Sequence, residues 1–163
     1  MLKELKEEDF IVSKTDLKGK IIYCNKNFIE ISEYKEEELL NQPHNILRHH
    51  QTPKAIFKYL WKNIQKKEEV FAFIINKTKN NNEYWVYANV TATLDTKNNI
   101  VDYYSVRRKA NPKALDIIIP LYKKMIEVER YQGIDASLKV LEDLLQEKGN
   151  ISYDEFIISL QKL

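Results

Sequence analysis

The residue types best suited to chemistry gather in one short segment, where Arg48 is followed by His49 and His50 and preceded by His44. Imidazole nitrogens bind metals and haem iron, so this segment raises a metal or haem site as one hypothesis. All three histidines belong to that single segment, and no second group of ligand residues accompanies them. Haem is therefore kept as an alternative, beside the simpler interpretation of Arg48 and His49 as a solvated basic turn.

No familiar catalytic pattern occurs in the chain. It contains no glycine-rich phosphate loop, no Ser-His-Asp arrangement, no zinc-ligand spacing and no kinase or diguanylate cyclase segment. Cys24 is the only cysteine, which excludes an internal disulfide and a cysteine-rich metal site. We interpret Cys24 as a small packed residue at a strand end. The chain is therefore not expected to be an enzyme.

The elements that must position these residues follow from the spacing of apolar side chains. Alternation predicts strands, and spacings of three and four predict helices. Asn25 is expected to cap the first helix, and Phe57 and Trp61 lie four residues apart on the apolar face of the longest. Strands are expected at 10–15, 20–25, 70–77, 83–94 and 100–107, and helices at 25–32, 36–40 and 53–66. This order predicts one α+β domain over residues 10–110.

Residues 113–163 are expected to form a helical extension of three helices. Pro120 is predicted to kink or restart the first helix, and Gly149 to end the second. Ser152 and Glu155 have the spacing of a capping box for the third. Each helix has an apolar stripe that it cannot bury alone. The extension must therefore pack on the sheet, on itself or on a partner chain, and it is the expected route of dimerisation or signal output.

One face of the predicted strand 83–94 and the N-terminal residues 1–9 are the last two features that the pattern predicts. Trp85, Tyr87 and Thr91 alternate along one face of the predicted strand 83–94, so this face is either a docking surface or is covered by the C-terminal helices. Residues 1–9 are expected to form an N-terminal helical cap.

Composition limits the class of protein. The 163 residues suit one domain with an appendage, and 26 basic against 24 acidic residues give a formal charge of +2. A nearly balanced charge without an arginine-rich block does not favour nucleic acid. No apolar run approaches the roughly 20 residues that a membrane span requires, and the first residues lack the apolar stretch of a secretory signal. We expect a cytoplasmic protein without direct membrane insertion.

Four stretches resemble the PAS sensor domain of the aerotaxis and energy-taxis receptor family. They are Ile21–Leu40 (IIYCNKNFIEISEYKEEELL), Asn41–Trp61 (NQPHNILRHHQTPKAIFKYLW), Asn76–Asn89 (NKTKNNNEYWVYAN) and, more weakly, Pro120–Lys123 (PLYK). The resemblance implies a PAS fold, which is a five-stranded antiparallel sheet with short helices and one long helix. The narrowest identifiers are the Gln-Pro-His-Asn and Arg-His pairs in the second stretch.

The resemblance also implies a noncovalently bound flavin, FAD rather than FMN. Arg48 and His49 would serve the flavin or its phosphate-bearing arm, because a guanidinium forks onto phosphate oxygens. Asn76 would face the polar edge of the ring, where an amide can both donate and accept hydrogen bonds. The implied cofactor-binding residues are Arg48, His49, Asn76, Trp61, Phe57 and Asn25.

The same resemblance shapes the expected mechanism. The position at which light-sensing relatives carry an adduct-forming cysteine falls near Asn45, so cysteine photochemistry is not expected. The chain lacks the signalling region that usually shares a chain with this sensor, which indicates a redox sensor that relays to a membrane-anchored chemotaxis-type receptor. The alternative functions are a PAS protein-interaction module with an empty pocket and a haem-based oxygen sensor. A homodimer is a possible assembly.

Overall fold

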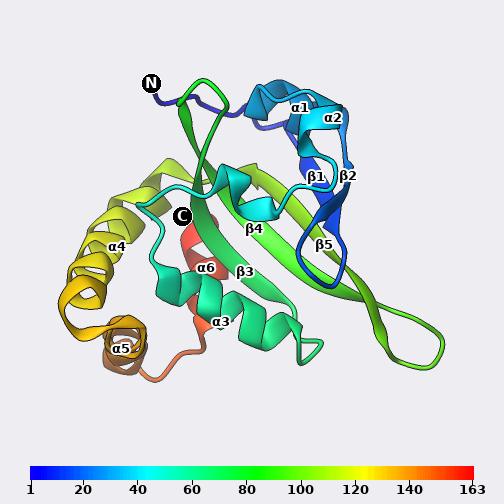
Figure 1. The fold of residues 1–163 in the computed structure, drawn as a ribbon. Coiled ribbons are helices and arrows are strands. Elements are labelled where there is room, and N and C mark those ends of the chain that lie inside the picture. The colour runs from blue at the N-terminus through cyan, green and yellow to red at the C-terminus, as the bar shows by residue number, and fades with distance from the viewer.

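The computed structural model describes residues 1–163 and contains one five-stranded sheet flanked by helices (Figure 1). The strands are β1 (Ile11–Thr15), β2 (Ile21–Cys24), β3 (Val70–Lys77), β4 (Glu83–Leu94) and β5 (Ile100–Lys109). They are ordered β2-β1-β5-β4-β3, and every neighbouring pair is antiparallel. Asn81 and Asn98 take positive φ in the β3–β4 and β4–β5 hairpin turns, as asparagine tolerates. The predicted α+β class and the predicted order of elements along the chain are confirmed.

The chain between β2 and β3 covers one face of this sheet. It forms α1 (Lys26–Ser32), α2 (Glu36–Leu39), the 3-10 helix η1 (His44–Leu47) and α3 (Lys54–Ile64). Asn25 caps α1 as predicted, since its side chain accepts a hydrogen bond from the Phe28 amide at 3.0 Å. Helix α3 begins after Pro53 and places Ile56, Leu60 and Ile64 in the core. The site segment around Arg48 therefore lies in the short connection between η1 and α3.

The C-terminal extension consists of α4 (Pro112–Gln132), α5 (Ile134–Glu147) and α6 (Tyr153–Gln161). Helices α4 and α5 contact each other and α3, while α6 contacts β3, so the extension wraps the edge strand of the sheet (Figure 1). A covered edge cannot pair with another chain. Ser152 and Glu155 form the predicted capping box. None of the helices combines the length and apolarity that crossing a lipid bilayer requires.

Of the two effects predicted for Pro120, the restart of the helix does not occur, because α4 runs continuously through this residue. Proline removes one backbone donor from a helix. Pro120 lies on the exposed side of α4, where water can satisfy the carbonyl that loses its partner.

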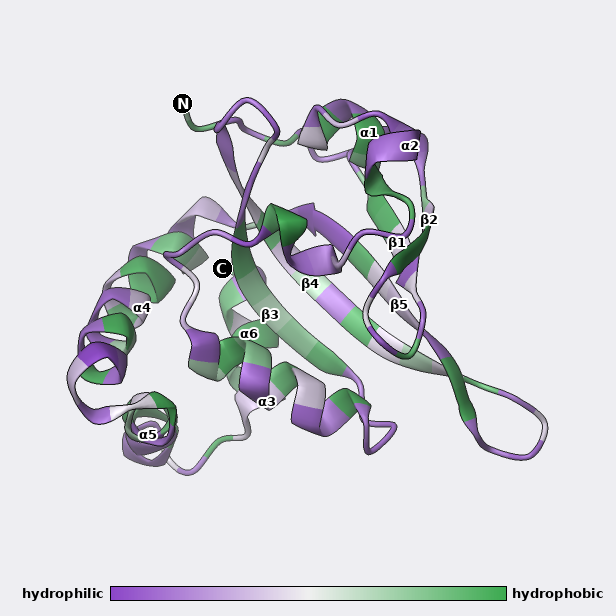
Figure 2. Cartoon of the chain, viewed as in Figure 1, coloured by the Kyte–Doolittle hydropathy of each residue, from purple (hydrophilic) through white to green (hydrophobic).

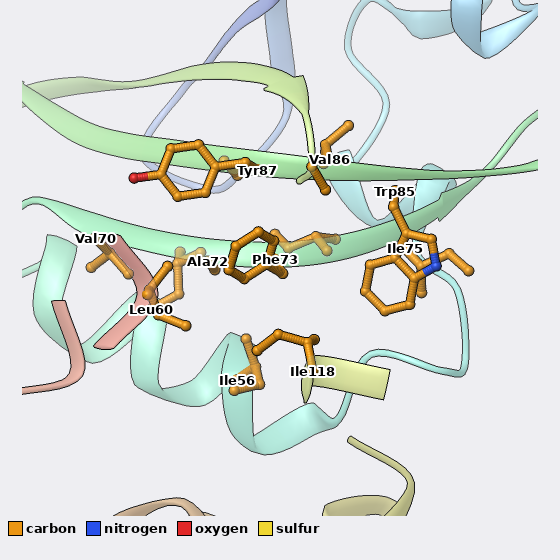
Figure 3. Close-up of a cluster of buried hydrophobic side chains, with 14 of the residues drawn as sticks. Ile56, Leu60, Val70, Ala72, Phe73, Ile75, Trp85, Val86, Tyr87 and Ile118 are labelled. Atoms are coloured by element: carbon orange, nitrogen blue, oxygen red, sulfur yellow. The ribbon is translucent and has the colours of Figure 1, made fainter. Parts of the chain in front are cut away.

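The C-terminal helices cover the aromatic stripe of β4. Trp85 and Tyr87 are buried, and the rings of Trp85 and Tyr122 lie 6.1 Å apart. The Tyr122 hydroxyl donates to the Phe73 carbonyl at 2.7 Å. Figure 3 shows Ile118 of α4 beside this cluster, and Figure 2 shows the apolar character of β3 between the helices. Of the two expectations for this face, cover by the extension is the one observed.

The N-terminal residues do not form the predicted helix. Leu2 pairs in parallel with Glu83 at the start of β4, and the Lys3 amide donates to the Glu83 carbonyl at 2.6 Å. The Lys3 ammonium lies 3.1 Å from the Glu33 carboxylate. The alternating charges of this segment find partners on the domain rather than within a helix, and only Leu5 of residues 1–9 is buried.

Candidate functional site

A cavity of about 310 Å³ lies between the sheet and the elements η1 and α3. The inward-facing side chains of β1, β3, β4 and β5 line its floor, and the β1–β2 turn closes one side. Ala88 at the centre of β4 is small and fully buried, which leaves space above the sheet. Cavities of this size are at the lower end of small-molecule sites, which span roughly 300–1,000 Å³.

Four of the six predicted site residues line this cavity, namely Arg48, Phe57, Trp61 and Asn76. The Arg48 guanidinium lies 4.0 Å from the centre of the Phe57 ring, which holds the charge over an aromatic face. Arg48 also forms an isolated backbone bridge with Asn76, so the turn and β3 meet at the cavity. Asn76 is 5% exposed, which excludes the alternative of a solvent-facing strand residue.

Trp61 lies between two walls of the cavity. Its ring is perpendicular to that of Tyr103, with centres 5.3 Å apart. Gly19, in the β1–β2 turn, has φ of 82°, and a Cβ at this position would lie 3.3 Å from the indole. The close approach and the left-handed backbone both require glycine there. Trp61 is thus fixed by contacts from the turn and from β5.

The other two predicted residues, Asn25 and His49, do not line the cavity. The Asn25 amide oxygen accepts from the Val12 and Phe28 amides, and its nitrogen donates to the Phe10 carbonyl, so the side chain joins β1 to α1. His49 is buried with Nε2 2.9 Å from Glu83 and Nδ1 accepting from the Gln51 amide. Burial lowers the pKa of His49. Both residues hold the scaffold in this structure.

Sequence reasoning gave no cavity role to Arg107 or Ser13, and it named His44 only as a candidate metal or haem ligand, but all three line the cavity. Arg107 is 2% exposed, its Nη2 donates to Ser13 Oγ at 2.6 Å, and its Nη1 lies 3.1 Å from His44 Nε2. Burial lowers the pKa of Arg107 to about 10. Burial and the nearby positive charges of Arg107 and Arg48 lower the pKa of His44 to about 3. The imidazole is therefore neutral at physiological pH.

One signal in the sequence could have located Arg107. Tyr103, Ser105 and Arg107 alternate along β5, and the pairing of β5 with β1 and β4 puts all three on the cavity face. An arginine on the same alternating face of a strand as buried residues is unusual, because burying a charge is costly unless the charge has a partner.

The electrostatic character of the cavity is uniform. Lys18, Arg48 and Arg107 line it, and no aspartate or glutamate does. Lys18 and Arg48 are exposed, whereas Arg107 is buried. Aromatic walls, one buried amide and unopposed positive charge together suit a planar ring with polar edges and an anionic substituent.

Residues 7–107 match the family model described as PAS fold. The chain is 35% identical over 121 residues to the aerotaxis receptor of Escherichia coli (strain K12). The aligned region covers 74% of this chain and 24% of the receptor. The chain is also 28% identical over 97 residues to a nitrogen fixation regulatory protein of Klebsiella oxytoca. This aligned region covers 60% of this chain and 20% of that protein. The chain thus spans a quarter or less of the length of these relatives.

Solved structures share the fold. A light-oxygen-voltage domain studied with a flavin analogue superposes with a TM-score of 0.60 at 19% identity, covering 71% of this chain and 86% of that one. The light state of the aureochrome1 light-oxygen-voltage domain gives a TM-score of 0.59 at 21% identity, covering 70% and 90%. Identities this low show a common fold. In this chain Asn45 lines the cavity, whereas the buried Cys24 does not.

Proposed function

The chain belongs to the PAS family, and from this premise we propose that it is a sensor whose cavity binds a flavin noncovalently and reports the redox state of that flavin to a signalling partner. FAD is the form that the resemblance to energy-taxis receptors favours. The observation that carries the proposal is the cavity itself, with its aromatic walls, its buried Asn76 amide and its unopposed cations.

The residues present fit such a cofactor. Phe57 and Trp61 offer flat surfaces, and Asn76 offers an amide that can donate or accept at the edge of a ring. Arg48 and Lys18 carry positive charge where the cavity meets solvent, which suits a phosphate-bearing arm. A bound flavin would supply reversible electron transfer, which no side chain of this protein provides.

The proposed output route begins at α3. One side of this helix lines the cavity, and its N-terminus is held by Glu129 of α4, whose carboxylate oxygens accept from the Lys54 and Ala55 amides at 3.1 Å. Lys58 of α3 also lies 2.7 Å from Asp135 of α5. A shift of α3 would therefore reach the extension directly. Two arrangements of this contact could encode the signal.

The partner that this proposal requires is a membrane-anchored receptor of the chemotaxis type, contacted in the cytoplasm. The support is the similarity to the E. coli aerotaxis receptor, of which this chain matches 24%.

The visible absorption spectrum of the purified protein tests the proposal. We expect a two-band flavin spectrum, and FAD as the compound released by denaturation. Protein that stays colourless after incubation with FAD and FMN would contradict flavin binding and favour an interaction module. A Soret band would favour the haem alternative.

Arg48→Ala tests the assigned residue. We expect at least tenfold weaker flavin binding without loss of folding, since a charge-assisted contact is removed. Arg130→Ala, an exposed arginine on α4, is the control for loss of a positive charge. Full flavin occupancy in Arg48→Ala would overturn the assignment of the phosphate-bearing arm.

A further inference from the structure

Arg107 is a buried cation whose charge no other group of the chain neutralises. It takes part in none of the salt bridges of the protein. Its Nε has no hydrogen-bond partner, although the side chain is 2% exposed. Burying an ionised group costs several kcal/mol unless a counter-charge or a full set of acceptors compensates. An arginine left in this state is therefore unexplained by stability alone.

The three groups that do contact Arg107 are all neutral. Ser13 Oγ accepts from Nη2, His44 Nε2 lies 3.1 Å from Nη1, and the guanidinium lies 4.8 Å from the centre of the Phe28 ring. Because arginine can only donate, His44 Nε2 must be the acceptor, which requires a neutral imidazole with its proton on Nδ1. These contacts fix the orientation of the guanidinium and leave its charge unopposed.

Arg107 is placed where its charge can contact a ligand in the cavity. Arg107, His44 and Ser13 all line the cavity, together with Asn76 and Tyr103. A preorganised charge in a cavity of low polarity interacts more strongly with an opposite charge than it would in water, and it needs no rearrangement to do so. A ligand that acquires negative charge inside this cavity would supply the missing partner.

We propose that Arg107 is the charge-recognition residue of the cavity, so that the site binds the reduced, negatively charged form of the flavin ring more tightly than the neutral oxidised form. The inference rests on the proposed function. An oxidised ring that takes two electrons from an external reductant and one proton from solvent carries one negative charge. Ser13 and His44 act as positioning residues, because they hold the guanidinium without cancelling it.

A redox titration with dithionite and a reference dye tests the proposal. Arg107→Gln should weaken binding of the reduced ring at least tenfold relative to the oxidised ring, which lowers the two-electron midpoint potential by about 30 mV. Arg107→Lys keeps the charge and should retain most of the wild-type potential. Arg108→Gln is the matched control, since Arg108 is the next residue of β5, is exposed and does not line the cavity.

The outcomes separate the inference from the proposed function. A flavin-loaded Arg107→Gln protein with the wild-type potential overturns the inference and leaves flavin binding intact. An equal fall in Arg107→Gln and Arg108→Gln also overturns it, because net charge would then explain the effect.

A second measurement needs no flavin. If Arg107 serves a ligand, the ligand-free protein should not depend on it, and Arg107→Met should unfold in urea at the same or a higher midpoint than wild type. A lower midpoint would show a structural role and overturn the inference. If wild-type protein takes up no flavin, the proposed function fails, and the inference that rests on it fails too, whatever the urea midpoint of Arg107→Met.

Discussion

Glu129 offers a quantitative test of how the C-terminal extension supports the cavity. The first residue before α3 is Pro53, which makes no side-chain capping hydrogen bond. The amides of Lys54 and Ala55 instead donate to the two carboxylate oxygens of Glu129, each at 3.1 Å. A carboxylate that lies 74 and 75 residues along the chain thus acts as the N-terminal cap of the helix that carries Phe57.

The magnitude follows from these two contacts. Loss of an N-terminal cap costs about 0.5–2 kcal/mol, and loss of a negative charge beside a helix N-terminus costs about 0.3–1 kcal/mol. We expect Glu129→Ala to lower the free energy of unfolding by about 1.5 kcal/mol. For a protein of this size, that corresponds to a fall in Tm of about 3–6 °C. The first turn of α3 should loosen, and flavin affinity should fall with it.

Urea unfolding followed by tryptophan fluorescence provides the assay, because Trp61 lies on α3. Glu127→Ala, two residues earlier on α4 and exposed, is the control for a change of charge and helix propensity. Equal unfolding free energies for Glu129→Ala and Glu127→Ala would refute the reasoning. The contact between the extension and α3 would then contribute nothing measurable.

Two further predictions concern contacts outside the cavity. Tyr122→Phe removes the hydroxyl that donates to the Phe73 carbonyl. This substitution should lower the free energy of unfolding, measured by urea titration, by about 1 kcal/mol. The control Tyr131→Phe, at a residue 76% exposed, should leave the free energy of unfolding unchanged. Hydrogen bonds, led by that from Thr78, lower the pKa of Glu33 from 4.5 to about 2. Its stabilising effect should be complete above about pH 4.5 and lost as the pH falls towards 2, so the difference in unfolding free energy between wild type and Glu33→Gln should narrow over that range. A difference that stays constant to pH 2 would contradict this assignment.

The secondary structure was largely predictable because its signals are local. Strands β3 and β4 have the predicted bounds, and Asn25, Pro53, Ser152 and Gly149 lie at the helix ends where their backbone preferences place them. The two errors have a common cause. Residues 1–9 and Pro120 were judged by local propensity, whereas long-range pairing with β4 and exposure on α4 decided their structure.

The candidate site was only partly predictable. Arg48, Phe57, Trp61 and Asn76 line the cavity, as a cofactor role for these residues requires, but Asn25 and His49 point to scaffold contacts. In a turn such as that from Arg48 to His50, neighbouring side chains diverge, and no periodicity tells which of them enters a cavity. The role of a charged side chain depends on the groups that it contacts when buried, and those groups come from distant parts of the chain.

By itself, the sequence determined the order of the elements, the α+β class and the resemblance to PAS sensors, because periodicity, capping and motifs depend on neighbours along the chain. Only the tertiary structure brought Arg107 within 3.1 Å of His44, 63 residues away, and showed that no acid accompanies them. It also placed Glu129 at the start of α3. The burial of a charge and the identity of its partner depend on packing between distant segments, and that information is absent from local pattern.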